Sequence, residues 1–347
     1  MNILYVINSY GLGHWTRSKA LITEIEKINS QAEIIIATNI AFDFVTADLL
    51  KKHNFVTWKN EFGIYASSFE KIESKTLISI NNYLSKYELI VNNFIEILTE
   101  YKIDAIITDV EASVIEAGNR INIPSLAISN FTWYEIFMDL NIKLSKLDLI
   151  KDSYEKSNFF YELPFSTEKE LTLKKKKVGL LTRFFSDNRS NLRKKLGFTD
   201  STLFIPNNNL VSKKLYNLKY LKPFIENDWQ IAIYENLPNR ELFPQYDKYI
   251  TLPTSIKSND VILASDFVIA KVGYGICSEI LSSGTPLGFF YRSFFSEDKA
   301  LIKGIKENSL GKPLECPTKL DFSIPTRQQQ KKIHNKDIAI EIMKVLS

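Results

Sequence analysis

The chain has 347 residues, of which 45% are hydrophobic and 24% are charged, a balance that suits about two globular domains and excludes a disordered or low-complexity chain. The net charge of +4 is too small to indicate a nucleic-acid partner, and two cysteines, Cys277 and Cys316, are too few for a disulfide framework or a four-thiolate zinc site. No uncharged apolar run reaches the ~20 residues of a membrane span. The apolar N-terminus has no basic residues before it, so we expect a cytoplasmic protein rather than a secreted or membrane-embedded one.

The first half of the chain alternates short apolar runs with helical patterns. Strands are predicted at residues 2–8, 33–38, 105–108 and 125–129. Apolar residues at helical spacing predict helices at residues 21–28, 89–98 and 114–119. This alternation is typical of a parallel sheet covered on both faces, in which ligands bind beyond the carboxyl ends of the strands.

The second half repeats the pattern after an interruption at residues 163–177, which ends in four lysines at 174–177. We interpret the lysines as a solvated linker; the alternative is a peripheral contact with a membrane surface or a polyphosphate. Strands are predicted at 202–206, 229–234, 267–270 and 286–291, and helices at 191–196, 260–265, 276–284 and 338–346.

The predicted fold class is therefore α/β, with two tandem doubly wound, Rossmann-like domains and an interdomain cleft. The predicted boundaries are an N-terminal domain at 1–165, a linker at 166–177, a C-terminal domain at 178–330 and a C-terminal helix at 331–347.

A glycine pair and a histidine follow the first predicted strand. Gly11 and Gly13 permit positive φ and close approach of a ligand, and the amides of a helix N-terminus favour anions. The dinucleotide fingerprint does not fit, because Thr16 stands where its third glycine would be. His14 is a candidate proton acceptor near neutral pH. The alternative is a loop histidine that only bonds the backbone.

Two acidic residues, Asp109 and Glu111, lie at the end of a neighbouring predicted strand. Asp109 can orient His14 and stabilise its protonated form; the alternative is a cap for the helix that follows. The Asp-x-Glu spacing also suits a metal, but no further carboxylate or histidine cluster supports one, so we expect no metal site.

The strand at 267–270 runs into a glycine-bracketed loop and a helix predicted to begin about Ile276. Such a loop can hold a diphosphate through backbone amides. Glu279, expected in the first helical turn, can reach the vicinal hydroxyls of a ribose. The alternatives are a plain left-handed turn for the glycines and a carboxylate that only complements the helix dipole.

Two acidic residues, Glu297 and Asp298, follow the strand at 286–291 and can accept hydrogen bonds from sugar hydroxyls. The alternative is a solvated loop with acidic helix caps. Aromatic residues of the first half form either a sugar or lipid platform or, as we favour, part of the core. These residues are Phe42, Phe44, Trp58, Phe62, Trp133 and Tyr134.

These motifs resemble those of the GT-B glycosyltransferases, in the branch of the lipid-II-forming N-acetylglucosaminyltransferase, and the chain is similar to the glycosyltransferase-like N-terminal region of L-arabinokinases. The matching stretches are residues 11–17, 108–109, 129–133, 264–279 and 292–297. The resemblance implies metal-independent, inverting transfer of a hexosyl or N-acetylhexosaminyl group from a nucleotide sugar, by family habit a UDP-sugar, to a small-molecule, glycan or lipid-linked hydroxyl. The nucleotide sugar is a substrate, and no cofactor is implied.

The resemblance also implies roles for individual residues. His14 is the base for the acceptor hydroxyl, with Asp109 as its acidic partner, and Asn130 and Trp133 lie on the acceptor side. Within the donor site, Glu279 binds the nucleotide ribose, and Glu297 and Asp298 lie near the donor sugar. The donor residues in full are Gly13, Asn207, Lys271, Gly273, Tyr274, Gly275, Ser278, Glu279, Glu297 and Asp298.

One loop departs from the family pattern. After the strand at 202–206, a glycine-rich turn is replaced by Asn207-Asn208-Asn209. Asparagine tolerates the left-handed conformation, but it adds a side chain where glycine lets a phosphate approach. This departure favours a catalytically impaired sugar-nucleotide sensor as one alternative. A nucleotide-sugar hydrolase or epimerase on the same fold is another.

Overall fold

The computed structural model describes residues 1–40, 47–58, 61–140, 146–167, 171–215, 220–314 and 325–346. Contacts divide the chain into two compact units. The first comprises Met1–Leu181, Phe294–Glu297 and His334–Ser347, and the second comprises Thr182–Ser293 and Asp298–Ile333. Each unit contains one parallel sheet, so the predicted α/β class with two sheets is confirmed.

The first unit is built on a seven-stranded sheet with the order β3-β2-β1-β4-β5-β6-β7. All of its strand pairs are parallel. The strands are β1 (Asn2–Ile7), β2 (Glu33–Thr38), β3 (Asn54–Val56), β4 (Ala105–Asp109), β5 (Ser125–Ser129), β6 (Phe159–Glu162) and β7 (Lys175–Lys177). The order reverses between β1 and β4, which is the switch point at which doubly wound sheets bind ligands.

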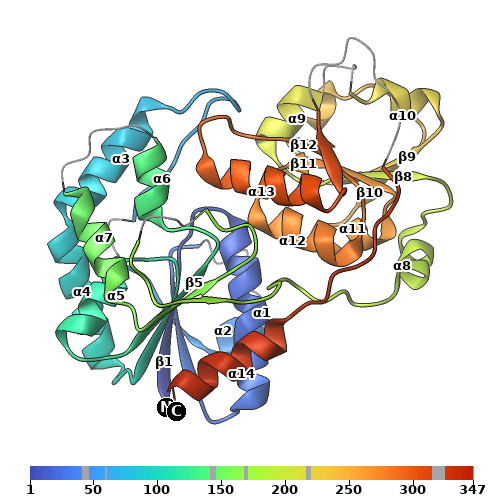
Figure 1. Ribbon diagram of the computed structural model, residues 1–347. Helices are drawn as coiled ribbons and strands as arrows, with labels where there is room; N and C mark the ends of the chain where they lie inside the picture. The colour runs from blue at the N-terminus through green and yellow to red at the C-terminus, as the bar shows by residue number, and fades with distance from the viewer. Residues whose placement is uncertain are drawn as a thin grey trace. The chain divides into compact units, whose positions relative to one another are not determined.

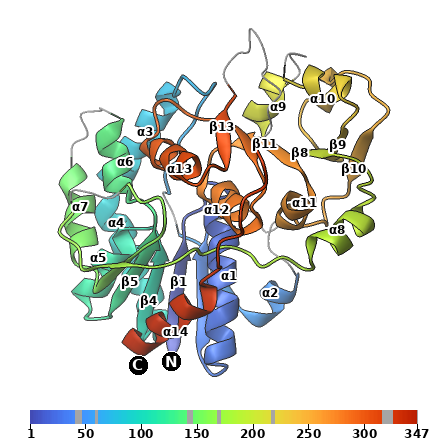
Figure 2. The same ribbon diagram turned by 45° about the vertical axis from the view of Figure 1, so that its right-hand side comes forward.

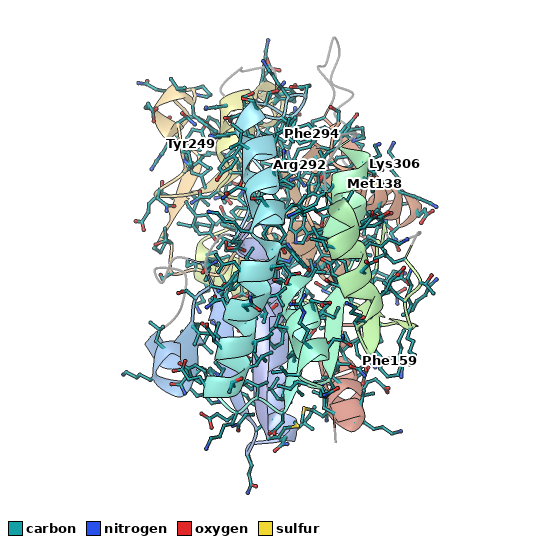
Figure 3. The ribbon with its side chains drawn as sticks, turned by 90° about the vertical axis from the view of Figure 1, so that its left-hand side faces the viewer. Met138, Phe159, Tyr249, Arg292, Phe294 and Lys306 are labelled. Carbon is teal, nitrogen blue, oxygen red and sulfur yellow. The ribbon has the colours of Figure 1, made fainter. Side chains whose placement is uncertain are left out.

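Helices cover both faces of this sheet (Figures 1 and 2): α1, α2 and α14 lie on one side, and α4, α5 and α7 lie on the other. Figure 3 looks onto the second face, with α3 and α4 in front of the strands. The helices are α1 (Leu12–Ile28), α2 (Ala47–Lys52), α3 (Ser74–Ser85), α4 (Tyr87–Glu100), α5 (Ser113–Arg120), α6 (Trp133–Asp139), α7 (Leu147–Glu155) and α14 (Asn335–Leu346). The central strands are mostly apolar because both of their faces are buried.

The second unit has a six-stranded parallel sheet with the order β10-β9-β8-β11-β12-β13. Its switch point lies between β8 and β11. The strands are β8 (Thr202–Ile205), β9 (Gln230–Tyr234), β10 (Tyr249–Leu252), β11 (Phe267–Lys271), β12 (Leu287–Phe290) and β13 (Gly311–Pro313).

In both views of the second unit, α8, α11 and α12 lie on one side of the sheet, opposite α9 and α10 (Figures 1 and 2). The helices are α8 (Arg189–Leu196), α9 (Asn209–Leu215), α10 (Lys222–Glu226), the 3-10 turn η2 (Arg240–Leu242), α11 (Ser258–Ala264), α12 (Tyr274–Ser283) and α13 (Ser296–Glu307). Among the residues that the structure describes, no helix has the length and apolar content needed to cross a lipid bilayer.

Three sequence predictions need correction. The predicted linker at 166–177 includes β7, which pairs with β6 at the edge of the first sheet, and contacts place the division between the units after Leu181. The apolar spacing at 21–28 marks only the second part of α1, which begins at Leu12. Helix α12 begins at Tyr274, two residues earlier than expected. In the first turns of α1 the buried face carries the polar residues His14 and Arg17. The helical spacing of apolar residues is therefore visible only later in the helix.

Candidate functional site

The first cluster of polar residues lies at the switch point of the first sheet. Strand β1 ends at Ile7, in register with Asp109 at the end of β4. Gly11 precedes α1 with a φ of +84°, a conformation that disfavours any residue with a Cβ. His14, Arg17 and Ser18 follow at positions that share one face of α1, and all three are buried. The turn and the helix therefore bring these side chains to the end of β4.

His14 and Asp109 form the contact that the sequence predicted. His14 Nδ1 lies 2.8 Å from Asp109 Oδ1, and the two side chains are 7% and 1% exposed. The ring of His14 also packs edge-on against Phe131, with 5.7 Å between ring centroids. The alternative of a loop histidine that bonds only the backbone is wrong, because the ring nitrogen contacts a buried carboxylate.

Arg17 completes this pair, although sequence reasoning assigned it no role. Its Nε donates to Asp109 Oδ2 at 2.6 Å and its Nη2 donates to Asp109 Oδ1 at 2.5 Å. Ser18 Oγ also donates to Oδ2, at 3.0 Å. Burial alone would raise the pKa of Asp109, but the charge of Arg17 and the hydrogen bonds from Arg17 and His14 hold that pKa well below its ordinary value. Asp109 is therefore an anion at neutral pH.

The hydrogens of Arg17 decide the tautomer of His14. Arg17 Nη2 has two hydrogens, and two acceptors lie within reach: Asp109 Oδ1 at 2.5 Å and Ser129 Oγ at 3.1 Å. Neither hydrogen then remains for His14 Nδ1, which lies 3.0 Å away. Asp109 Oδ1, 2.8 Å from Nδ1, can then accept a hydrogen bond from a proton on that nitrogen. We therefore assign the proton to Nδ1, which leaves a lone pair on Nε2 that can accept a proton.

Asn130 and Glu297 extend this network. Arg17 Nη1 donates to Asn130 Oδ1 at 2.8 Å, and Asn130 Nδ2 donates to Glu297 Oε1 at 3.1 Å. Both residues are buried. The sequence placed Asn130 with the acceptor and Glu297 with the donor sugar, and the structure places them in one hydrogen-bonded chain behind Asp109.

Trp133 lies among aromatic rings of the first unit. Its ring centroid is 4.7 Å from that of Phe62 and 5.7 Å from that of Tyr10. Trp58, Phe62, Trp133 and Tyr134 are all buried in the core, in agreement with the core interpretation that the sequence favoured. Phe42 and Phe44 lie outside the described residues. The indole Nε1 of Trp133 is buried and has no hydrogen-bond partner among the described residues.

The second cluster lies after β11 in the second unit. Gly273 precedes α12 with an extended backbone, and a Cβ added there would meet only Lys271 Nζ, at 3.9 Å. Tyr274 and Gly275 form the start of α12, whose first amides have no partner within the helix. Ser278 Oγ is 3.1 Å from Thr182 Oγ1 and donates to the carbonyl of Gly275 at 2.9 Å. The loop therefore offers backbone amides, while the Ser278 hydroxyl is engaged within the unit.

Glu279 lies in the second turn of α12 and not in the first, because the helix begins at Tyr274. It is therefore not a carboxylate that merely complements the helix N-terminus. Arg183 Nε donates to Glu279 Oε1 at 2.8 Å, and Arg183 Nη2 contacts the same oxygen. Burial raises the pKa of Glu279 above its ordinary value even though the Arg183 charge opposes the shift. Arg183 carried no sequence signal, since it stands two residues after Leu181 in a stretch without a motif.

Asp298 is fully buried and bonded to Arg292 (labelled in Figure 3). Its Oδ2 accepts from the Arg292 backbone N at 2.7 Å, and its Oδ1 accepts from Arg292 Nη2 at 2.6 Å. The alternative of a solvated acidic loop is wrong for both Glu297 and Asp298. Asp298 closes the turn between β12 and α13.

The asparagine loop after β8 forms a helix cap. Asn208 Oδ1 accepts from the backbone N of Leu210 and of Val211, both at 3.1 Å. Asn207 Nδ2 donates to Asn236 Oδ1 at 2.5 Å. Neither Asn207 nor Asn208 has a positive φ, so the left-handed turn that the sequence allowed is absent at these two residues.

Comparisons with known proteins agree with this architecture. A family model described as "Glycosyl transferase family 1" matches residues 1–148, which contain His14, Asp109 and Asn130. The structure resembles that of Phytolacca americana UGT2 complexed with UDP-2fluoro-glucose and pterostilbene, with a TM-score of 0.62, 11% identity and coverage of 100% of this chain and 90% of that one. It also resembles MurG of Acinetobacter baumannii, with a TM-score of 0.55, 10% identity and coverage of 99% and 90%. The chain has the GT-B fold.

A match to a curated protein sequence also agrees with the resemblance found in the sequence. L-arabinokinase of Arabidopsis thaliana is 24% identical over 306 residues, which are 86% of this chain but only 29% of that protein. The chain therefore spans less than a third of that relative. The sequence resemblance to GT-B glycosyltransferases and to a region of L-arabinokinases is confirmed.

In this GT-B chain sequence reasoning missed two arginines, the buried Arg17 and the partly exposed Arg183. Arg17 had a usable signal, because it lies three residues after His14 and so shares its helix face. Arg183 lies far from Glu279 in sequence, so only the fold brings them together.

Proposed function

We propose that the protein transfers a sugar from a nucleotide sugar to a hydroxyl group of an acceptor, with inversion at the anomeric carbon and without a metal ion. The observation that carries this proposal is the buried pair of His14 and Asp109, which leaves His14 Nε2 able to accept a proton. The GT-B fold raises the expectation of such chemistry by analogy.

The reaction is a single displacement. His14 Nε2 removes the proton of the acceptor hydroxyl while that oxygen forms a bond to the anomeric carbon. The bond between the anomeric carbon and the diphosphate oxygen breaks, and the nucleoside diphosphate leaves with the bonding electrons. The imidazolium that forms is stabilised by Asp109, whose depressed pKa keeps it anionic. Backbone amides at the start of α12 stabilise the charge of the leaving diphosphate.

The donor proposal assigns the diphosphate to Gly273, Tyr274 and Gly275, and the ribose to Glu279. The open space at Gly273 and the elevated pKa of Glu279 support it. A carboxylate with a raised pKa is incompletely stabilised, and donation from two ribose hydroxyls would stabilise its anion. We propose a UDP-hexose or UDP-N-acetylhexosamine as donor, since the UGT2 structure holds a UDP-sugar analogue.

The acceptor proposal assigns Trp133 and the neighbouring loops of the first unit to a small molecule, a glycan or a lipid-linked sugar. The unpartnered indole N–H of Trp133 supports an acceptor that carries oxygen atoms.

A second candidate is a protein that binds a sugar nucleotide without turnover. The asparagine loop after β8 supports it, because Asn207 adds a side chain where a close phosphate approach is common in this fold. A hydrolase is the third outcome that the experiment below distinguishes.

Calorimetric titration with UDP, GDP, dTDP and CDP tests the donor site first. We expect one nucleotide to bind, and we expect Glu279→Ala to weaken that binding at least about tenfold. The matched control is Glu226→Ala, which removes an exposed carboxylate of the same unit. If none of the four nucleotides binds, the donor proposal is wrong.

Turnover is then measured with the corresponding nucleotide sugar, with and without acceptor mixtures. His14→Ala should abolish transfer while nucleotide binding stays within about twofold of wild type. Release of free sugar without any acceptor would indicate a hydrolase, and binding without turnover would favour the sensor.

A further inference from the structure

The tautomer of His14 depends on where Arg17 directs its hydrogens. Arg17 Nη2 lies 3.0 Å from His14 Nδ1, close enough to donate to a ring nitrogen that lacks a proton. In that arrangement the proton of the neutral ring would lie on Nε2, and Nε2 could not accept another. A base at Nε2 therefore requires that the nearby hydrogens of Arg17 be bound elsewhere.

Asn130 holds the guanidinium in the orientation that meets this requirement. Arg17 Nη1 donates to Asn130 Oδ1 at 2.8 Å. The guanidinium is rigid and planar, so fixing Nη1 also fixes the direction of both Nη2 hydrogens. In this orientation they meet Asp109 Oδ1 and Ser129 Oγ.

Glu297 decides which end of the Asn130 amide faces Arg17. Asn130 Nδ2 donates to Glu297 Oε1 at 3.1 Å, so the NH₂ group of the amide faces Glu297. The amide oxygen must then point toward Arg17. With the amide reversed, its NH₂ group would face the guanidinium, donor against donor, and Arg17 would lose this acceptor.

The residues next to Glu297 are buried. Phe294–Glu297 groups with the first unit, although Ser293 before it and Asp298 after it group with the second. The fully buried ring of Phe295 packs on Tyr10, with 6.3 Å between centroids. Asp298 is bonded to Arg292. The Glu297 carboxylate lies within the first unit, where it accepts from Asn130 Nδ2.

We propose that Glu297 and Asn130 are positioning residues that act through Arg17 to keep the proton of His14 on Nδ1. The inference rests on the proposed function only for the use of His14 as a base, because the tautomer is a property of the protein without substrate. In this proposal Glu297 helps to position His14, in place of the contact with the donor sugar that was expected from the sequence.

Nitrogen-15 NMR of the imidazole rings tests this directly, since the chain has only three histidines. Glu297→Ala removes the acceptor of Asn130 Nδ2, whereas Glu297→Gln keeps an oxygen that can accept. The matched control is Glu307→Ala, which removes an exposed carboxylate of the same helix, α13. We expect the Nδ1–H tautomer of His14 in wild type, in Glu297→Gln and in Glu307→Ala, and a mixture of both tautomers in Glu297→Ala.

The signals of His53 and His334 in the same spectra report whether each variant is folded, because both rings make contacts far from His14 along the chain. Should Glu297→Ala not fold, Asn130→Leu breaks the same link with a side chain of similar size. An unchanged His14 tautomer in a folded variant overturns the proposal.

Kinetics separate this inference from the proposed function. Glu297→Ala should lower kcat about tenfold while nucleotide affinity stays within about twofold, with recovery in Glu297→Gln. Nucleotide-sugar affinity that falls at least about tenfold in both variants, with the tautomer unchanged, would mean that Glu297 binds the donor. A tautomer shift in Glu297→Ala, in a protein whose wild type shows no turnover, supports the positioning role and removes the proposed transferase.

Discussion

The candidate site of each unit holds a buried carboxylate beside an arginine, and the two carboxylates differ in their pKa. In the first unit, Asp109 faces Arg17 and its pKa is depressed. In the second unit, Glu279 faces Arg183 and its pKa is raised. The difference lies in the number of donors. Both oxygens of Asp109 accept hydrogen bonds, from Arg17, Ser18 and His14, whereas the bonds from Arg183 all reach one oxygen of Glu279.

This difference matches two kinds of site. A carboxylate whose hydrogen bonds are complete without a ligand holds its charge and its neighbours in place, which suits the partner of a base. A buried carboxylate that is incompletely stabilised gains from new donors, which suits a residue that binds ribose hydroxyls. The burial of a carboxylate beside an arginine therefore does not reveal its task until the donors on each oxygen are counted.

The largest effect is expected from Asp109→Asn, which breaks the first pair. The change keeps the size of the side chain but leaves the buried Arg17 charge without a partner, at a cost of about 3–5 kcal/mol in the free energy of unfolding. It also removes the acceptor that fixes the His14 tautomer, so kcat should fall by about 10³–10⁴-fold. Urea unfolding and steady-state kinetics measure the two effects. A stable variant with nearly full turnover would show that the pair has neither role.

Glu279→Gln is expected to change the free energy of unfolding less than Asp109→Asn does, and its effect should vary with pH. Arg183 is 25% exposed and keeps contact with water, so loss of the pair should cost only about 1 kcal/mol. The raised pKa of Glu279 means that the folded protein binds more protons than the unfolded chain between the unfolded pKa of about 4.3 and the folded value. The stability that this proton binding gives the folded protein is fully present below that pH window and is lost as the pH rises through it.

The measurement is the free energy of unfolding at about pH 4.5 and about pH 8. Glu279→Gln should gain stability relative to wild type as the pH rises. Asp109→Asn should show no such change, because the depressed pKa of Asp109 gives stability that is fully present above about pH 3.9 and is lost only as the pH falls through its folded value. The loss in the free energy of unfolding caused by Asp109→Asn should therefore be the same at both pH values. If the free energies of unfolding of the two variants changed with pH by the same amount relative to wild type, the proposed difference between the two carboxylates would be wrong.

The sequence predicted the two sheets because buried parallel strands are continuous apolar runs bounded by turns, as in β2 and β5, whose predicted limits match the structure. It missed β7 because this strand consists of three exposed lysines at the sheet edge, where charge discourages pairing with other chains. It missed β3 and β13 because three residues cannot show a period.

The site was predicted where the chemistry is local. Asp109 ends β4 and His14 lies in the first turn of α1, just after the neighbouring strand β1, so topology alone brings them together. The Arg183–Glu279 and Asn130–Glu297 contacts join residues 96 and 167 positions apart. Neither a period nor a motif encodes such distances, and only the packed fold reveals them.

The smallest effect on stability comes from adding one methyl group at a glycine of each site. Gly11→Ala should cost about 1 kcal/mol, because its φ of +84° strains any residue with a Cβ even though the space around it is open. Gly273→Ala should leave the free energy of unfolding within about 0.5 kcal/mol of wild type, since its backbone is extended and its surroundings are open.

The methyl group of Gly273→Ala would stand where the diphosphate approaches the amides of α12. Nucleotide affinity should therefore fall about tenfold or more in Gly273→Ala and stay nearly unchanged in Gly11→Ala. Calorimetry on both variants decides this, and equal affinities would place the diphosphate away from this loop and leave the second carboxylate–arginine pair without its proposed ligand.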